Sequence, residues 1–326
     1  MTETTYLIQD EAVQKALVPS RLIPVMEQVF RDVSSGALKM MPRGALFHTN
    51  GNIFAVMSAT LPSFGVCGCK AAIFPGPATA AANTQQSVVL LFELETSALQ
   101  GIVSAEHITV ARTAAATAAA TNALALPDAS VLCLLGAGNQ AMGHARAVCT
   151  IRPIREIRIW DVDPARAQAA CATLSGENLG LVRTAATAEE AVRGAQIICT
   201  VSKAKEPILY GDWLMPGAHV NAVGACSPMA RELDLSVLQR SKVYVDQRQA
   251  ALESAGDLLI PIKAGQYTEG EIVGEIGEVL NGTCPGRTQG DRTTVTVYET
   301  TGLAAQDVAA AYAVLQNTAE TTSFQF

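Results

Sequence analysis

A short apolar run that leads directly into a glycine turn constrains this chain more than any other segment. Residues 131–135 are all apolar, which is typical of a strand buried on both faces of a parallel sheet. The turn and helix start that follow read Gly136-Ala137-Gly138-Asn139-Gln140-Ala141. The first glycine permits a tight turn, the second lets the backbone approach a pyrophosphate, and Ala141 allows close packing of helix on strand. This segment therefore predicts a dinucleotide-binding turn.

The residues after this turn repeat the alternation of strand and helix. Residues 156–160 are a second β-prone run, after which Asp163-Pro164 provides an N-cap and a first helical residue. A capping box at residues 187–190 predicts a further helix. More β-rich runs lie at residues 196–201, 219–223 and 242–245. Alternating strands and helices predict an α/β fold with a doubly wound parallel sheet, a Rossmann-type domain at about residues 123–302.

Asp161, the acid directly after the second strand, predicts which dinucleotide is bound. An acid at this place hydrogen-bonds the adenosine ribose, which favours NAD(H), whereas an NADP(H) site needs a neighbouring cation. Val162 and Asp163 supply none, but Arg166 lies one helical turn further on and leaves NADP(H) open. The structural alternative is that Asp161 is a solvated strand end.

The remaining segments predict a second, α+β domain built from both ends of the chain. Helical patterns cover residues 23–36, 108–126 and 304–318, and β-prone runs cover residues 53–57 and 87–94. We expect this domain to comprise residues 1–122 together with 303–326. For residues 317–326 the sequence leaves two alternatives open, disorder and support of a dimer.

Composition excludes several classes of protein. With 49% hydrophobic and 16% charged residues, the chain is not disordered, collagen-like or a coiled coil. A net charge of -7 provides no basic excess for nucleic acid, and proline, glycine and amide residues interrupt the long uncharged stretches that a membrane span would need. The N-terminus lacks a secretory pattern and the cysteines are scattered, so we expect a soluble, cytoplasmic protein with reduced thiols and no metal site.

Several further motifs occur in order along the chain. They read Arg112-Thr113-Ala114-Ala115, the glycine turn, Glu206-Pro207-Ile208, Pro216-Gly217-Ala218-His219, Asn221-Ala222-Val223-Gly224-Ala225 and Thr301-Gly302-Leu303-Ala304-Ala305-Gln306-Asp307. Together they resemble the ornithine cyclodeaminase/mu-crystallin family, and the resemblance covers most of the chain. It implies NAD(P)H-dependent chemistry on small imino or amino acids. It also implies a homodimer formed through the N-terminal domain, which binds the substrate, and an active site in the cleft between the domains.

The resemblance assigns substrate-binding roles to a few residues of this sequence. Arg43 matches the position that grips a substrate carboxylate, and Gln86 falls where a polar pocket group is expected. Lys70 matches the pocket lysine at the reacting carbon and nitrogen, and Arg112 matches an arginine between the substrate carboxylate and the cofactor phosphates. These residue types suit the chemistry, because arginine binds carboxylates with two parallel hydrogen bonds and lysine can carry a proton. The alternative for each is a solvated surface charge, which fits Lys70 and Arg112 poorly because their neighbours are apolar.

The same match implies a set of cofactor contacts, with the nicotinamide near residues 200–202 and 222–225. The residues are Arg112, Thr113, Gly136, Gly138, Asn139, Gln140, Asp161, Thr200, Val201, Ser202, Val223, Gly224 and Gly302.

One departure from the family pattern narrows the activity. Cyclodeaminases carry an aspartate, their general base, where this chain has Met229, and a thioether cannot accept a proton. We therefore expect an imine reductase rather than an ornithine cyclodeaminase, since hydride transfer to a protonated imine needs no such base. The expected reaction converts a 2-imino carboxylate, cyclic or acyclic, to an L-amino acid by hydride transfer to the α-carbon, with Lys70 as the catalytic residue. The alternatives are an alanine-type amino-acid dehydrogenase and a non-enzymatic, crystallin-like ligand-binding protein.

Overall fold

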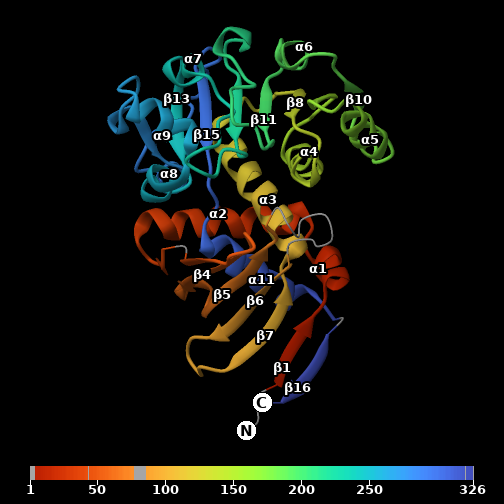
Figure 1. Cartoon of the computed structure of the whole chain (residues 1–326), viewed down its shortest axis with the longest axis vertical. Helices are drawn as coiled ribbons and strands as arrows, with labels where there is room; N and C mark the ends of the chain where they lie inside the picture. The colour runs from red at the N-terminus through yellow and green to blue at the C-terminus, as the bar shows by residue number, and fades with distance from the viewer. Residues whose placement is uncertain (1–3, 43, 77–85, 320, 326) are drawn as a thin grey trace. The chain divides into compact units, whose positions relative to one another are not determined.

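The computed structural model describes residues 4–42, 44–76, 86–319 and 321–325. The chain forms two compact units, unit 1 from Met1–Thr113 with Leu303–Phe326 and unit 2 from Ala114–Gly302 (Figure 1). The division falls inside helix α3 (Glu106–Leu124), whereas the sequence placed it after residue 122. The reason for the difference is that α3 continues unbroken through the division, so no glycine or proline marks it.

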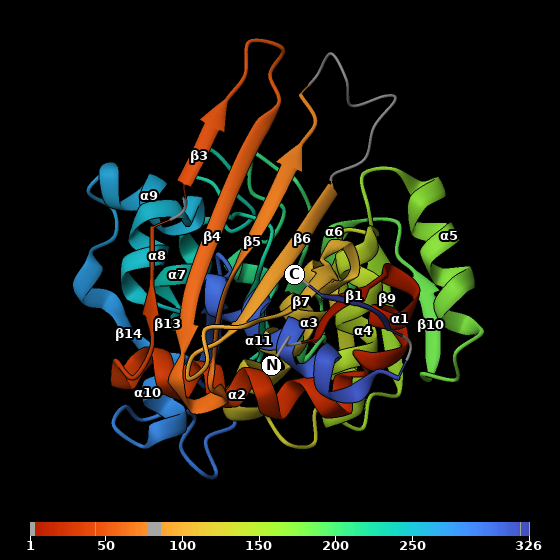
Figure 2. The same cartoon turned by 90° about the horizontal axis from the view of Figure 1, so that it is seen from below.

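Unit 1 is built on a mixed sheet in the order β16-β1-β7-β6-β5-β4-β2, with β3 paired to β4. The strands are β1 (Thr4–Ile8), β2 (Lys39–Met40), β3 (Gly44–Phe47), β4 (Ile53–Leu61), β5 (Val66–Phe74), β6 (Gln86–Glu93), β7 (Leu99–Ser104) and β16 (Thr322–Gln325). Strands β3 to β7 pair antiparallel, and β1 pairs parallel with β7 (Figure 2). Within the last ten residues, Thr322–Gln325 form β16, which pairs antiparallel with β1.

Helix α11 (Ala304–Asn317) covers one face of this sheet and packs on β4, β5 and β6. Its many alanines permit a close approach, and at Gly68 of β5 an added Cβ would contact Val308 at 3.4 Å and the backbone oxygen of Leu90. Helices α1 (Asp10–Ala16) and α2 (Pro19–Ser35) complete the unit. The predicted helix at residues 23–36 is confirmed as α2, which ends at Gly36 in the left-handed conformation.

Unit 2 is a parallel sheet in the order β10-β9-β8-β11-β12-β15-β13-β14. The strands are β8 (Val131–Leu135), β9 (Glu156–Trp160), β10 (Leu181–Thr184), β11 (Ile197–Thr200), β12 (His219–Ala222), β13 (Ser241–Val245), β14 (Ile272–Glu275) and β15 (Val295–Glu299). From β8 the chain proceeds outward to β10 and then returns to place β11 on the other side of β8. The predicted doubly wound, Rossmann-type sheet is confirmed.

Alternate residues of β8 belong to different cores, so helices cover both faces of this sheet. Cys133 and Leu135 pack with residues of α6 (Ala188–Val192), α7 (Leu235–Gln239), α8 (Arg248–Ser254) and α9 (Gly256–Lys263). Leu132 and Leu134 pack with residues of α4 (Asn139–Ile151) and α5 (Pro164–Ser175). Helix α10 (Ile276–Asn281) follows β14, and short 3₁₀ helices lie at Pro62–Phe64, Gly211–Trp213 and Glu269–Glu271. Burial on both faces explains why the strand sequence is continuously apolar.

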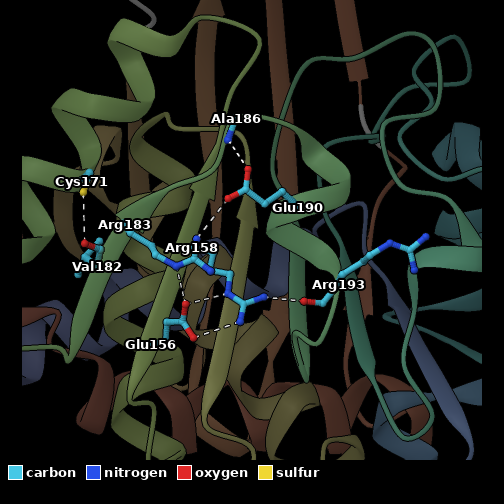
Figure 3. Close-up of polar contacts among 8 residues, drawn as sticks. All are labelled: Glu156, Arg158, Cys171, Val182, Arg183, Ala186, Glu190 and Arg193. Carbon is cyan, nitrogen blue, oxygen red and sulfur yellow. Dashed lines mark hydrogen bonds and ion pairs between the residues drawn. The ribbon is translucent and has the colours of Figure 1, made fainter.

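Polar contacts tie the outer strands of unit 2 to their neighbours (Figure 3). Glu156 of β9 accepts hydrogen bonds from Nε of Arg158 at 2.9 Å and from Nε of Arg183, on β10, at 2.6 Å. Arg158 Nη1 also donates to the backbone oxygen of Arg193 at 2.6 Å. These bonds join β9, β10 and the segment after α6 on one side of the sheet. Among the described helices, none has the length and apolar character needed to cross a bilayer.

Candidate functional site

The carboxyl ends of the central strands of unit 2 lie at one level. Leu135 at the end of β8 pairs with Thr200 of β11, Thr200 pairs with Ala222 of β12, and Ala222 pairs with Glu299 of β15. The residues that follow these ends are those predicted from the sequence to contact the cofactor. The structure therefore brings Gly136, Gly138, Val201, Ser202, Val223, Gly224 and Gly302 to one edge of the sheet, at the switch point where such folds bind dinucleotides.

The glycine turn has the backbone that the dinucleotide motif requires. Gly136 has a φ of 114°, and a Cβ there would lie 2.9 Å from the backbone oxygen of Val201, so a side chain is excluded. Gly138 is the N-cap of α4 and gives the helix no side-chain cap, which leaves first-turn amides available to an anion. The buried Oε1 of Gln140 has no hydrogen-bond partner among the described residues. The positive φ of Gly136 and the free first-turn amides of α4 fit the pyrophosphate of a dinucleotide, whereas the Oε1 atom of Gln140 can only accept a hydrogen bond.

Asp161 is hydrogen-bonded to the turn and is not merely a solvated strand end. Its Oδ2 accepts from the amide of Ala137 at 2.8 Å and its Oδ1 accepts from the amide of Asp163 at 2.9 Å. A carboxylate oxygen has further lone pairs, so a ribose hydroxyl can still be accepted. The exposed guanidinium of Arg166 lies near the turn, with Nη2 3.5 Å from the place a Cβ of Gly138 would occupy.

Glu232 accepts hydrogen bonds from the segments that follow β11 and β12, a role that the sequence did not predict. Its Oε1 accepts from the amide and the hydroxyl of Ser202, each at 2.6 Å, and its Oε2 accepts from the amide of Gly224 at 2.8 Å. Glu232 is fully buried. The two segments on which we expect the nicotinamide to lie are therefore fixed to one carboxylate.

Unit 1 contains a buried charge cluster that joins three elements. Lys70 of β5 places its Nζ 2.7 Å from Oδ2 of Asp307 on α11, and Nε of Arg112 on α3 donates to Oδ1 of Asp307 at 3.1 Å. The whole-residue exposures of Lys70, Arg112 and Asp307 are 2%, 8% and 1%. Nη1 of Arg112 also donates to Oε1 of Gln306 at 3.0 Å. We call Lys70, Arg112, Gln306 and Asp307 the basic cluster.

Local structure explains how Lys70 comes to face an acid. Residues 68 and 70 lie on the same face of β5, and at Gly68 that face is in contact with α11. The side chain of Lys70 therefore points toward the helix that carries Asp307. Burial raises the pKa of Asp307, but Arg112 and Lys70 outweigh this and hold the pKa below its usual value. The cluster therefore brings two cations and one carboxylate together in a buried place.

Other predicted residues of unit 1 are distributed differently. Arg43 lies outside the described residues. Gln86 is the exposed first residue of β6, and no hydrogen bond among the described residues joins it to the basic cluster. The hydroxyl of Thr113 donates to the backbone oxygen of Thr109 on its own helix at 2.7 Å. Within the described residues, no three His, Cys, Asp or Glu side chains gather closely enough to hold a metal ion.

Asp307 and Glu232 are the residues that sequence reasoning missed. Asp307 is the last residue of one of the motifs that resemble the family, and Glu232 lies three residues after Met229. The sequence analysis assigned a role to neither acid. A signal for Asp307 is an acid within an otherwise apolar segment, since a buried carboxylate requires a partner. Glu232 has charged neighbours, Arg231 and Asp234, and so lacks that signal.

Comparisons with known proteins give matches over most of the chain. A model of the ornithine cyclodeaminase/mu-crystallin family matches residues 3–322. The chain is 33% identical over 316 residues to ketimine reductase mu-crystallin of Rattus norvegicus, a match that covers 94% of this chain and 95% of that protein. It is 38% identical over 238 residues to the Mus musculus protein of the same name, covering 73% of this chain and 71% of that protein.

Solved structures show the same fold in full. Delta(1)-pyrroline-2-carboxylate reductase of Thermococcus litoralis, in complex with NADH and L-proline, is similar with a TM-score of 0.90 and 27% identity over 96% of this chain and 97% of that one. An archaeal alanine dehydrogenase dimer with bound NAD is similar with a TM-score of 0.91 and 26% identity over 99% of this chain and 100% of that one.

Proposed function

The chain belongs to the ornithine cyclodeaminase/mu-crystallin family, and we propose that it is an NAD(H)-dependent reductase of 2-imino carboxylates. The product is an L-amino acid, formed when hydride reaches the α-carbon of a cyclic ketimine or an acyclic imino acid. The observation that carries the proposal is the buried position of two cations, Lys70 and Arg112, which share the carboxylate of Asp307. An arginine and a lysine held side by side can both donate hydrogen bonds to an anionic substrate.

Each charged residue of the cluster has a distinct role in this proposal. Arg112 binds the substrate carboxylate, assisted by Arg43, because a guanidinium can donate two parallel hydrogen bonds to it. Lys70 orients the C=N group and donates a hydrogen bond or a proton to its nitrogen. Asp307 fixes where Lys70 and Arg112 point, and so orients the Lys70 amine as a donor to the imine.

The edge of the parallel sheet holds the cofactor. When bound, NADH supplies the hydride. The amides of α4 bind the pyrophosphate, Asp161 accepts from the adenosine ribose, and Ser202 and Gly224 border the nicotinamide. Asp161 favours NAD(H), and the cofactors of the two similar structures, NADH and NAD, support this. Arg166 leaves NADP(H) open as a second cofactor.

A homodimer is part of the proposal. Strands β3, β4 and β5 of unit 1 carry exposed apolar side chains around a groove of about 360 Å³, among them Leu46, Phe47, Phe54 and Ile73. Exposed apolar groups of this kind mark interaction surfaces, and the similar alanine dehydrogenase is a dimer. Light scattering of the purified protein should give twice the mass of 34.1 kDa. The cytoplasmic location expected from the sequence stays a prediction.

Two other activities are kept as alternatives. An alanine-type dehydrogenase would form its imine in the site from a 2-oxo acid and ammonia, and the similarity to an alanine dehydrogenase supports this. Ornithine cyclodeaminase is disfavoured, because Met229 is 78% exposed and provides no base. A crystallin-like binding protein would need neither Lys70 nor its proton, so the buried pairing of Lys70 argues against it.

Loss of absorbance of the reduced nicotinamide tests these possibilities directly. NADH and NADPH are each mixed with a five- or six-membered cyclic ketimine carboxylate, or with pyruvate and ammonium. Consumption with the ketimine supports the proposal, and consumption with pyruvate and ammonium alone favours the dehydrogenase. Release of ammonia from ornithine without cofactor consumption would show that Met229 was misread. Tight NADH binding without turnover of any substrate would favour the binding protein.

A further inference from the structure

The buried carboxylate of Glu232 in unit 2 accepts hydrogen bonds from two separate segments, each of which directly follows a strand of the sheet. Ser202 follows β11 and donates through both its amide and its hydroxyl, each at 2.6 Å. Gly224 follows β12 and donates through its amide at 2.8 Å. Each carboxylate oxygen thus holds a different segment. These are the segments to which the proposed function assigns the nicotinamide.

The backbone of Glu232 is fixed independently of its side chain. The amides of Glu232 and Leu233 both donate to Oδ1 of Asp257 at 2.8 Å. The backbone oxygen of Glu232 accepts from the amides of Ile208 and Leu209 at 2.8 and 3.0 Å. The carboxylate is therefore presented from a rigid base, so its position determines where Ser202 and Gly224 lie.

Glycine at position 224 is required for this arrangement. A Cβ there would collide with the backbone oxygen of Ser202 and would lie 2.5 Å from Oε1 of Glu232. Without a side chain, the amide of Gly224 can reach both the carboxylate and the oxygen of Thr200, the latter at 3.2 Å. The segments after β11 and β12 are thereby held close together.

The arrangement favours an ionised carboxylate, because the amide and hydroxyl of Ser202 and the amide of Gly224 all donate to it. Burial raises the pKa of Glu232, and donation by Ser202 and Gly224 opposes that rise. A glutamine would retain one acceptor oxygen but turn an NH₂ group toward one of the N–H donors. Substitution by glutamine therefore breaks the link to one segment while preserving shape.

We propose that Glu232 is a positioning residue for the nicotinamide half of the cofactor, acting through Ser202 and Gly224 without touching the reacting atoms. This inference rests on the proposed function. Hydride transfer is sensitive to geometry, since a misplacement of about 1 Å can cost on the order of a hundredfold in rate. The adenosine half is held elsewhere, at the glycine turn and Asp161, and does not depend on Glu232.

The test compares NADH with ADP-ribose, which shares the adenosine half and lacks the nicotinamide. In Glu232→Gln we expect the Kd for NADH to rise about tenfold, the loss of one hydrogen bond to a charged group, while the Kd for ADP-ribose is unchanged. We expect kcat with the imine substrate to fall more than the Kd for NADH changes. Asp234→Asn is the matched control: this carboxylate lies two residues away, accepts from the amides of Gly211 and Val237, and touches neither Ser202 nor Gly224.

A second variant keeps the test decisive if Glu232→Gln folds poorly. Ser202→Ala removes one donor and leaves Glu232 in place, so NADH affinity should fall a few-fold and ADP-ribose affinity should not change. If Ser202 acts through Glu232, adding Ser202→Ala to Glu232→Gln should weaken NADH binding by less than the two single effects combined.

Distinct outcomes would overturn the inference. Unchanged NADH affinity in Glu232→Gln would show that Glu232 does not position the cofactor. An equal loss of affinity for NADH and for ADP-ribose would show that Glu232 only stabilises unit 2 as a whole. Turnover of the imine by the wild-type protein together with either result contradicts this inference but not the proposed function. Failure of the wild-type protein to bind both NADH and ADP-ribose contradicts the proposed function itself.

Discussion

Replacing Asp307 by asparagine tests the basic cluster most sharply. The substitution keeps the shape of the side chain but removes the negative charge that Lys70 and Arg112 share at 2.7 and 3.1 Å. Two buried cations then lose the carboxylate that they share. We expect both stability and turnover to fall, because the variant loses the group that orients Lys70 and Arg112.

The size of the stability loss follows from the burial of the three residues, none of which is more than 8% exposed. Removing one partner of a buried ion pair costs about 3–5 kcal/mol, and Asp307 has two partners. For a domain of this size each kcal/mol lowers the Tm by roughly 2–4 °C, so a loss of about 10 °C is expected. The double variant Lys70→Met with Asp307→Asn removes one cation together with the acid and should recover part of this loss.

Urea or thermal unfolding of the single and double variants provides the measurement. A loss below about 1 kcal/mol in Asp307→Asn, or strictly additive effects of the two substitutions, would refute the electrostatic reasoning. The dependence of the unfolding free energy on pH provides a second measurement. Because the folded pKa of Asp307 is lowered, its stabilising contribution is present above the unfolded pKa of about 3.9 and is lost as the pH falls through the folded value. Asp307→Asn should lack that part of the acid-induced loss.

Three other predictions can be measured with the same protein. Lys70→Ala should lose at least a hundredfold in kcat while the Kd for NADH stays unchanged, and unchanged turnover would exclude Lys70 from the reaction. Arg166→Ala should weaken NADPH more than NADH in fluorescence titrations, since a 2′-phosphate gains most from a cation beside the turn; equal effects would place Arg166 at the pyrophosphate. Hydrogen bonds from Arg158 and Arg183 lower the pKa of Glu156 to about 2, so its stabilising effect is present above the unfolded pKa of about 4.3 and is lost toward pH 2. Glu156→Gln should flatten the stability curve in that window, and an unaltered curve would show that these surface bonds contribute nothing.

The elements that were predicted correctly are those specified by neighbouring residues. The runs at residues 131–135 and 156–160 coincide with β8 and β9, and Asp163 caps α5 by accepting from the amide of Ala165 at 3.0 Å. Apolar periodicity, caps and breakers act over a few residues, so a single sequence suffices to read them.

Elements that depend on distant partners were missed. Strands β10, β14 and β15 received no prediction, and β16 is a strand only because β1 supplies its hydrogen bonds from the other end of the chain. β10 is an edge strand of four residues without strict alternation, so its local pattern is weak. Pairing of this kind is decided by tertiary context.

The candidate site shows the same division between local and distant signals. Gly136 and Gly138 were identified because the glycine turn is itself the binding element. Arg112 was recognised by resemblance, but its partner Asp307 lies 195 residues further along the chain. The residues around Arg112 and Asp307 contain no pattern that predicts this ion pair. Glu232 was missed because its partners are mainly backbone amides, which every residue possesses.

These two acids give the candidate site a common logic. Cations are easily noticed in an apolar sequence, and the structure adds that Asp307 orients both Lys70 and Arg112. Glycines are noticed in the same way, and the structure adds that Glu232 holds the segment at Gly224. Neither acid needs to contact substrate, because a buried carboxylate with several donors cannot move without leaving some of them unpaired. In this fold the residues that carry the proposed chemistry are therefore held by acids on other segments, and we expect a substitution at either acid to lower turnover although neither contacts the substrate.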